Sequence, residues 1–421
     1  MSTLTDSSTA PTTRLTAARM QSFDQTQRYR LLFKPFSILL KKPLLLSEQR
    51  YQQLSDALWQ GDPAMDTLVD WLFAENPGQR KKLFEQALQH GVDSVEDCPQ
   101  PISDFFALVD TVPDWVEPQQ LDEAIEFMAA VGINANYILR DVALMGGYLL
   151  SGLNQALVLT GALNKGASQR VAETSKWWIE CTEKGGLKRE GAGFKATIHV
   201  RMIHTLVRRN LKNRKEWQAE QWGLPINQID MAATNLAFCS LLLLGLRGLG
   251  IFPSPRESRA VMHFWKYLGW LMGVDEAWLA DNETDGLLML YQSTFTQPAA
   301  DWTSQALGHA LSQEPLQKQY RYFSRLQQQF SYHKHLSISQ FFLGSKKMQQ
   351  LGLPRHVLPW FPLMVSPKNL LTFRLQRRLP VLRELQVARG RKSQWRYLNT
   401  FGDKGKQVIQ PQKNHPAYIA G

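Results

Sequence analysis

Apolar residues recur at i, i+3 and i+4 from about Leu45 onwards, and this helical spacing restricts the fold of the chain more than any other feature. Alternating β-branched runs bounded by Asn-Gly or Asp-Gly turns, which would indicate strands and hairpins, are missing. A chain of 421 residues with 44% hydrophobic residues can bury a large core without disulfides or structural metals. The sequence therefore predicts an all-α protein.

Composition divides the chain into three segments. Residues 1–44 start with a run rich in serine and threonine and predict an N-terminal arm, most simply a disordered one. Residues 45–345 contain no visible repeat and no Gly/Ser-rich linker, so we expect one large helical domain. In residues 346–421, five prolines between positions 354 and 380 predict an ordered but irregular extension rather than another layer of helices.

The cysteines and the N-terminus predict a cytoplasmic protein. Cys98, Cys181 and Cys239 are not spaced as a zinc knuckle or a CxxC redox pair, and their odd number would leave one thiol unpaired in an oxidising compartment. The N-terminal segment reaches Arg28 and Arg30 without the hydrophobic core of a signal peptide.

Two apolar stretches are predicted to lie in the core. Val142 to Asn164 has no charged residue, but its glycines and central polar residues indicate a buried helix or helical hairpin rather than a membrane span. Leu236 to Leu246 is too short to cross a bilayer and predicts a core helix. That helix should begin near Asn227, a good N-cap, because Asp230 follows three residues later.

Familiar enzyme motifs are missing from the chain. It has no HExxH, no paired ExxH of a di-iron bundle, no GxGxxG after a strand, no Walker loop and no GxSxG elbow. The commonest metalloprotease, dinucleotide-binding, phosphate-binding and serine-hydrolase chemistries therefore have no anchor in this sequence.

Among nine histidines, His204 has the most informative surroundings. It lies in a helix predicted from Gly193 to Asn210, where Val200 and Val207 share its face, so its imidazole should face packed side chains. Such an imidazole either bonds a backbone carbonyl, as an ordinary core histidine does, or binds a haem iron through one neutral nitrogen. His199 lies on another face and is expected to be structural or exposed.

A second helix is predicted from Ser168 to Trp178, before the His204 helix, with a natural stop at the glycines 185 and 186. On this helix Arg170, Glu173, Thr174 and Trp177 fall at offsets 0, 3, 4 and 7. Residues at these offsets share one face of a helix, so the four side chains should line the same space.

These segments resemble the latex clearing proteins, or rubber oxygenases, and the related fungal oxygenase that cleaves the farnesyl chain during mycophenolic acid biosynthesis. The resemblance covers roughly residues 125–290. It rests on RxxxT at Arg170 and Thr174, RMIH ending at His204, WGLPINQID from Trp222 to Asp230, Thr234, and HFWKYLGWLMGV from His263 to Val274. It implies a single large helical domain like the globin-like helical core of latex clearing proteins, with added helices.

In that family an Arg-x-x-Lys-Thr helix lines the distal side of a haem b, and a histidine of the next helix binds the iron from the proximal side. Carried over by position, the resemblance implies that His204 is the iron ligand and that Arg170 and Thr174 are distal-pocket residues. It also implies a haem-dependent oxygenase that oxidises or cleaves an apolar, unsaturated, isoprenoid or lipid-like substrate with dioxygen.

The sequence departs from the family pattern at Glu173, where rubber-cleaving relatives carry lysine. An ionised glutamate accepts hydrogen bonds and donates none, which puts polyisoprene cleavage in question. Glu173 is either a general base that removes an allylic proton, or a salt-bridge partner of Arg170, or exposed. Arg201 and Arg208, at i−3 and i+4 from His204, either reach a haem propionate or face solvent.

The C-terminal part of the chain is strongly basic. From Phe341 to Gly421, fifteen lysines and arginines face two acidic residues, a net charge of +13 within a total of +11, so the rest of the chain sums to −2. Residues 370–392 interleave apolar residues with arginines, which favours an anionic membrane surface as partner over nucleic acid, for which no binding motif is present. The alternative functions are therefore a cofactor-free helical protein that binds through this tail, or a haem sensor.

Overall fold

The computed structural model describes residues 16–28, 42, 44–161, 163 and 166–406, and within these ranges it contains helices and no strand. The predicted all-α fold is thereby confirmed. The first elements are α1 (Phe23–Gln27), α3 (Glu48–Ala57), α4 (Pro63–Ala74), α5 (Pro77–His90), η1 (Val92–Ser94), α6 (Gln100–Asp110) and α7 (Pro118–Ala130).

The central elements follow without a long connection. They are α8 (Ile133–Ile138), the π-helix η2 (Leu139–Leu144), α9 (Met145–Gly147), α10 (Ser151–Leu159), α12 (Ala167–Cys181), α13 (Ala192–Lys212), α14 (Ala219–Trp222), α15 (Gln228–Phe238), α16 (Ser240–Gly248) and α17 (Pro255–Leu271). The last elements are η3 (Glu276–Trp278), α18 (Glu283–Ser293), η4 (Thr294–Thr296), α19 (Trp302–Gln313), η5 (Glu314–Gln317), α20 (Ser324–Gln350), α21 (Trp360–Arg378), α22 (Pro380–Asn399) and η6 (Gly402–Lys406).

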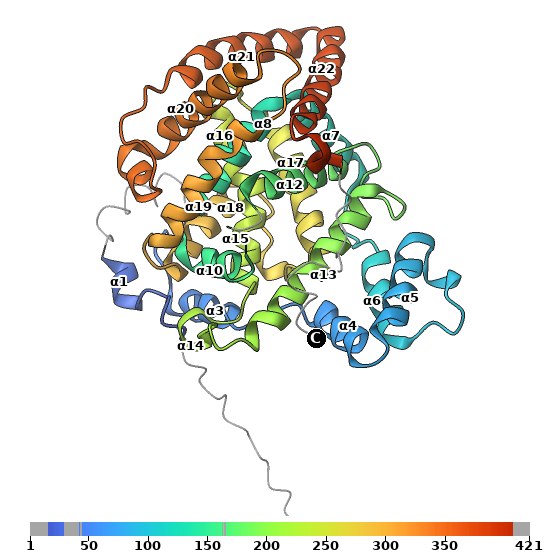
Figure 1. The fold of residues 1–421 in the computed structure, drawn as a ribbon. Helices are drawn as coiled ribbons and strands as arrows, with labels where there is room; N and C mark the ends of the chain where they lie inside the picture. Colours follow the sequence, from blue (N-terminus) through green and yellow to red (C-terminus); the bar gives the residue numbers. More distant parts are fainter. Residues whose placement is uncertain (1–15, 29–41, 43, 162, 164–165, 407–421) are drawn as a thin grey trace, which may run out of the picture.

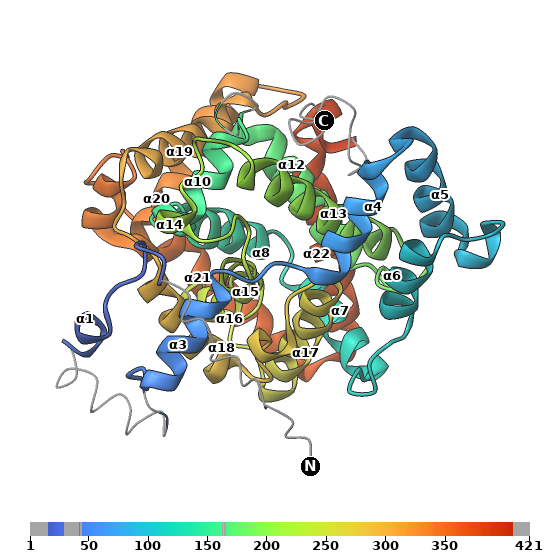
Figure 2. The same ribbon diagram turned by 90° about the horizontal axis from the view of Figure 1, so that it is seen from below.

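The helices are arranged in three groups, one at each end of the molecule and one between them. Figure 1 shows α3 to α6 at one end of the molecule and α20 to α22 across the other, with α12, α15 and α17 between them. In the view from below, α15 lies near the centre, with α10, α12 and α13 on one side and α17 and α18 on the other (Figure 2). The largest fully buried side chains include Trp178 of α12, Trp265 of α17 and Phe127 of α7, so the main core lies between these helices.

The apolar stretches predicted to be core segments are helical and mostly buried. Helix α15 begins as expected, because the Asn227 side chain accepts a hydrogen bond from the Asp230 amide at 3.0 Å. Residues 228–248 are the one described stretch long and apolar enough to cross a bilayer, but 72% of the window is buried inside the fold. The stretch from Val142 consists of two helices, 133–147 and 151–159, that meet at 94° rather than forming one straight helix.

Part of the predicted N-terminal arm is fixed on the core. The Arg19 guanidinium is buried, donates to the Asp230 carboxylate at 3.0 Å, and also donates to the carbonyls of Trp222 and Thr296. Ala17 shares a small hydrophobic cluster with Leu54 and Trp278. Residues 16–28 therefore belong to the folded body, whereas residues 1–15 of the arm lie outside the described part.

The expectation of an irregular C-terminal extension is wrong, because α21 and α22 are regular helices of 19 and 20 residues that pack on α20 and α7. The prolines are compatible with these helices. Pro359 is an N-cap, Pro362 lies in the first turn of α21 and Pro380 opens α22, positions where a backbone N–H has no partner in a helix. Pro367 alone lies inside α21.

A buried ionic network fastens α20 to the π-helix η2. Arg140 Nε donates to Glu314 Oε2 at 2.8 Å, and Asp141 Oδ2 lies 2.6 Å from His335 Nδ1 of α20. Burial raises the pKa of the Asp141 carboxyl to about 7, and burial lowers the pKa of His335 well below its usual value. The C-terminal helices are thus anchored by polar contacts in the interior as well as by apolar packing.

Candidate functional site

Helices α12 and α13 form the scaffold of the site because they pack unusually closely. Residue 193 of α13 must be glycine, since a Cβ there would lie 2.5 Å from the Cα atom of Cys181 on α12. The indole N–H of Trp177 then donates to Thr197 Oγ1 at 3.0 Å, which fixes the rotation of one helix against the other. Because Thr197 and His204 are seven residues apart, they lie on the same face of α13.

The imidazole of His204 lacks the hydrogen-bond partner that an ordinary core histidine has among its neighbours in the described residues. Its Nδ1 atom is buried and has no hydrogen-bond partner, and neither ring nitrogen bonds a described residue. Burial, and to a smaller extent the nearby Arg208 cation, lowers the pKa of the imidazole to about 4, although Asp62 opposes this shift. The ring is therefore neutral at pH 7, and the interpretation of a core histidine bonded to a carbonyl does not fit.

The other histidine of this helix behaves differently. His199 is buried, and its Nε2 lies 2.9 Å from Glu85 Oε1, in agreement with the expected structural role. The contrast within one helix is informative, because buried polar atoms without a partner are rare and costly in folded proteins. Nδ1 of His204 is such an atom, whereas the ring of His199 is satisfied.

The predicted face of α12 is arranged as expected but reaches different environments. Arg170 is half-buried and makes no hydrogen bond or ion pair within the described ranges. Glu173 is also half-buried, and its carboxylate accepts from the Gln169 side chain at 2.6 Å rather than from Arg170. Thr174 is exposed, whereas Trp177 is buried. The salt bridge considered for Glu173 is therefore not formed.

Thr174 of α12 and Thr234 of α15 lie next to a cluster of aromatic rings. The Trp177 and Phe238 rings meet with centroids 5.5 Å apart, and Phe238 stacks on Trp265 at 4.9 Å. Thr174 lies one turn before Trp177, and Thr234 lies one turn before Phe238. Both threonines are exposed although α12 and α15 lie in the middle of the molecule (Figure 2).

A run of partly or fully accessible residues continues from these threonines. On α13 it includes Val200, Ile203 and His204, and on α15 and α16 it includes Phe238, Leu241 and Leu244, the last of them 47% exposed. We call this set, together with Arg170, Glu173, Thr174 and Thr234, the accessible stripe. It includes the His204 imidazole, the Arg170 guanidinium, the Glu173 carboxylate, two hydroxyls and several apolar side chains.

Arg201 is committed to an internal ion pair. Its Nε and Nη2 atoms donate to the two Asp62 carboxylate oxygens at 2.6 and 2.8 Å, and Nη1 donates to the Leu271 carbonyl. Both side chains are buried, at 5% and 4% exposure, and Gly273 leaves room for them because a Cβ there would meet both groups. The placement of Arg201 gives no support to a propionate contact.

Arg208 is bound in the same way. Its guanidinium donates twice to Asp66 Oδ1, at 3.0 and 2.8 Å, and also to the carbonyl of Ile226. With Arg201 it ties α13 to the N-terminal half of α4 on both sides of His204. Sequence reasoning missed Asp62 and Asp66, because nothing in the local pattern shows that residues about 140 positions away will pair with this helix.

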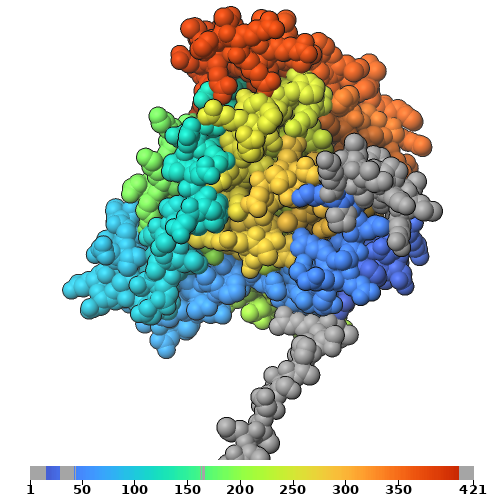
Figure 3. Space-filling view, turned by 180° about the vertical axis from the view of Figure 1, so that it is seen from behind, coloured from blue at the N-terminus to red at the C-terminus, as the bar shows by residue number. Residues whose placement is uncertain are grey.

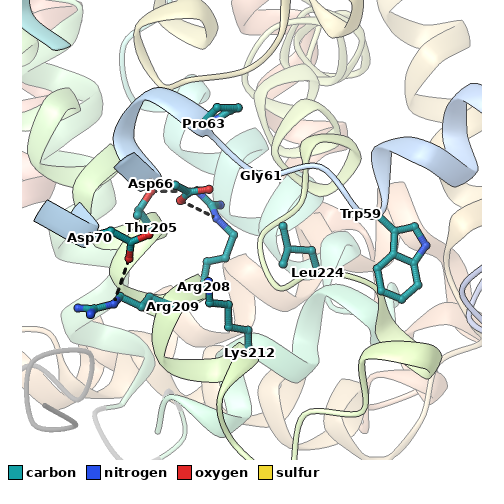
Figure 4. A pocket seen from close by; sticks show the side chains of 10 residues that line it. All are labelled: Trp59, Gly61, Pro63, Asp66, Asp70, Thr205, Arg208, Arg209, Lys212 and Leu224. Atoms are coloured by element: carbon teal, nitrogen blue, oxygen red, sulfur yellow. Dashed lines mark hydrogen bonds and ion pairs between the residues drawn. The ribbon is translucent and has the colours of Figure 1, made fainter. Parts of the chain in front are cut away.

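A charged hollow of about 340 Å³ lies between α4 and α13, beside Arg208. Figure 4 shows Asp66 bonded to Arg208 and Asp70 bonded to Arg209 along its wall, with Lys212 nearby. His204 is not among the residues that line it. Its paired charges suit neither an apolar substrate nor a porphyrin, so we do not assign the candidate chemistry to this hollow.

The comparisons with known proteins agree with the family resemblance. The family model described as "ER-bound oxygenase mpaB/B'/Rubber oxygenase, catalytic domain" matches residues 135–366. A rubber oxygenase from Streptomyces sp. (strain K30) is 21% identical over 199 residues, which are 46% of this chain and 47% of that protein. The match thus spans about half the length of the curated relative.

A solved structure of a latex clearing protein in the closed state superposes with a TM-score of 0.58 at 16% sequence identity. The superposition covers 80% of this chain and 91% of that one. At this identity the likeness shows the fold, and it agrees with the expected helical core with added helices. In the described residues no group of three or more histidine, cysteine or acidic side chains could hold a bare metal ion.

Proposed function

The chain belongs to the mpaB and rubber oxygenase catalytic-domain family, and from this membership we propose that it is a haem b-dependent oxygenase of an apolar, unsaturated substrate. The observation that carries the proposal is the neutral imidazole of His204 on the accessible stripe, whose Nε2 bonds no described residue. A haem would need one neutral imidazole nitrogen from the protein, because the porphyrin itself would supply the nitrogens that surround the iron. Nδ1 is enclosed, so Nε2 is the nitrogen we assign to the iron.

The residues present fit a haem in three respects. His204 is unprotonated at pH 7, as a metal ligand must be. The apolar residues Val200, Ile203 and Phe238 keep accessible surface that a flat macrocycle would cover. Arg170 keeps its guanidinium free of ion pairs within the described chain. When bound, a haem would supply the iron at which dioxygen is activated.

The remaining stripe residues are assigned roles that follow from their chemistry. Arg170 and Thr174 donate hydrogen bonds to polar groups on the distal side, because the guanidinium carries only donors and the hydroxyl bonds no described residue. Glu173, held by Gln169, only accepts when ionised, and we assign it as the base that removes a proton from the substrate. Leu241 and Leu244 exclude water and hold an isoprenoid or lipid chain.

Absorption spectroscopy of the purified full chain after haemin titration tests the cofactor. We expect a Soret band for the wild type, its loss in His204→Ala, and its partial return when imidazole is added to that variant. His199→Gln is the matched control, because it removes a buried imidazole from the same helix and should keep the band. A His204→Ala variant that binds haemin with an unchanged spectrum and affinity would contradict the proposal.

Product analysis then tests the reaction. The haem-loaded protein is incubated with dioxygen and prenyl or polyunsaturated lipids, and Arg170→Ala and Glu173→Gln are compared with the wild type. Both variants should keep the Soret band, and Glu173→Gln should lose at least about a hundredfold in turnover if the carboxylate is the base. A haem protein that oxidises none of these lipids would favour the sensor alternative.

A further inference from the structure

Exposed apolar side chains are concentrated at one end of the molecule. Fourteen of the twenty large hydrophobic side chains that are exposed in the described chain lie between residues 322 and 385. These residues belong to α20, α21, α22 and their connections, which we call the helical cap, and Figure 3 shows the cap covering one end of the molecule. Such a concentration is unusual for a free surface and marks an interaction site.

The outer face of α21 is both apolar and cationic. Met364, Lys368, Leu371, Leu375 and Arg378 recur at intervals of three or four residues, and all five are exposed. The opposite face, with Asn369, Phe373 and Gln376, is buried against the core. Helix α21 contains no acidic residue, so its outer face offers leucines and methionine flanked by uncompensated positive charge.

The cations of α21 and α22 divide into two groups. The inward group consists of Arg377, Arg383 and Arg391, which form ion pairs with Glu257, with Glu126 and with Glu183. The outward group is exposed and makes no ion pair with any described residue; it consists of Lys368, Arg374, Arg378, Arg389, Lys392 and Arg396. The inward group attaches the helices to the body, and the outward group is free for a partner.

We propose that the outer face of the helical cap docks on an anionic lipid surface. Exposed leucines enter the boundary between headgroups and acyl chains, while lysine and arginine side chains contact the headgroup phosphates. Nucleic acid would use the cations but would leave the leucines in water. A second copy of this chain would bring two cationic faces together, and their repulsion opposes such a dimer.

This inference rests on the proposed function and adds the place at which an apolar substrate would reach the protein. Leu244, the last residue of the accessible stripe, lies one turn before Gly248 on α16, and Gly248 packs against Phe342 of α20, so this end of α16 meets the helical cap. The family model ends at residue 366, before most of the cationic face. Substrates dissolved in a bilayer would be delivered to the end at which the protein docks.

Co-sedimentation of the full chain with vesicles tests the inference without haem or substrate, so its outcome is separate from that of the proposed function. The wild type should pellet with phosphatidylcholine vesicles that contain 30% phosphatidylglycerol and should stay in solution with pure phosphatidylcholine. Arg374→Gln with Arg378→Gln should lower the partition coefficient about 25-fold, at roughly fivefold for each cation near the surface. Leu371→Ser with Leu375→Ser should lower it at least tenfold.

Lys212→Gln with Lys215→Gln is the matched control, because it removes two exposed cations at the C-terminal end of α13, away from the cap. This control should pellet almost like the wild type. Equal pelleting with neutral and anionic vesicles would overturn the inference, as would unchanged binding of the two cap variants. Retention of a DNA duplex in place of vesicles, or a dimer that Leu371→Ser with Leu375→Ser dissociates, would also overturn it. Circular dichroism verifies that the variants are folded.

Discussion

Removing the charge of Asp62 should destabilise the protein far more than removing that of Asp70. Asp62 is the N-cap of α4 and Asp70 lies in its second half, and both pair with arginines of α13. The Asp62–Arg201 pair is about 95% buried and has two bonds, whereas Asp70 and Arg209 are 65% and 37% exposed with one contact at 3.3 Å. Loss of one partner leaves Arg201 buried without a counter-ion, which typically costs about 3 to 5 kcal/mol.

Asn is the appropriate substitution because it keeps the shape of the side chain. Asp62 Oδ1 also accepts from the Met65 amide as the N-cap of α4, and asparagine caps a helix almost as well. Asp62→Asn therefore isolates the charge. The matched Asp70→Asn variant should lose less than about 1 kcal/mol, the usual worth of an exposed pair.

Urea unfolding followed by circular dichroism measures both variants. We expect the midpoint of Asp62→Asn to fall clearly below that of the wild type with little change of slope, and that of Asp70→Asn to stay close to it. The same test distinguishes two roles of Arg201. If Arg201 is structural, loss of its partner Asp62 should lower the stability of the fold more than it lowers the affinity for haem. If the two variants lost equal stability, or if Asp62→Asn lost less than about 1 kcal/mol, the assignment of Arg201 to this pair would be refuted.

Two further predictions concern the cap and the pH dependence of stability. Gly390→Ala should weaken the docking of α22 on α7 by about 1 to 3 kcal/mol or more, because its Cβ would clash with the Ala129 carbonyl oxygen. Gly78→Ala is the control, because a Cβ at residue 78 meets open space. Limited proteolysis of the C-terminal helices compares the two variants, and equal protection would contradict the clash. Burial lowers the pKa of His263, whose Nε2 accepts a hydrogen bond from the Glu117 amide at 2.8 Å. The His263 imidazole therefore takes up its second proton more readily in the unfolded chain than in the folded one. Stability should therefore fall as the pH drops below about 6.5, by at most about 1.4 kcal/mol per unit, and this part of the slope should vanish in His263→Gln.

Local sequence signals predicted the helices of the candidate site well. The helix predicted from 168 to 178 is observed as Ala167–Cys181, and that predicted from 193 to 210 is observed as Ala192–Lys212. Glycine pairs and helical periodicity are properties of neighbouring residues, so a single sequence contains them. The start of α15 at Asn227 was predictable for the same reason.

Features that depend on distant residues were not predictable. Arg201 and Arg208 sit at suitable offsets from His204, but the aspartates that bind them come from α4, about 140 positions earlier. Periodicity also placed Thr174 and Trp177 on one face without indicating that the threonine is exposed and the tryptophan buried. The C-terminal prolines led to the wrong prediction of an irregular extension, because the number of prolines does not show whether each one falls in the first turn of a helix.

The contact between Arg19 and Asp230 makes the start of the chain a structural partner of the site. Asp230 begins the same helix as Thr234, and the Thr234 hydroxyl donates to the Asp230 backbone carbonyl at 2.8 Å. A protease that removed the first nineteen residues would delete the buried Arg19 cation and leave the Asp230 carboxylate without its counter-ion, four residues before Thr234 of the accessible stripe. Trimming that stops before residue 16 would spare this contact, so the position of the cut would decide whether the shortened protein keeps an intact interior.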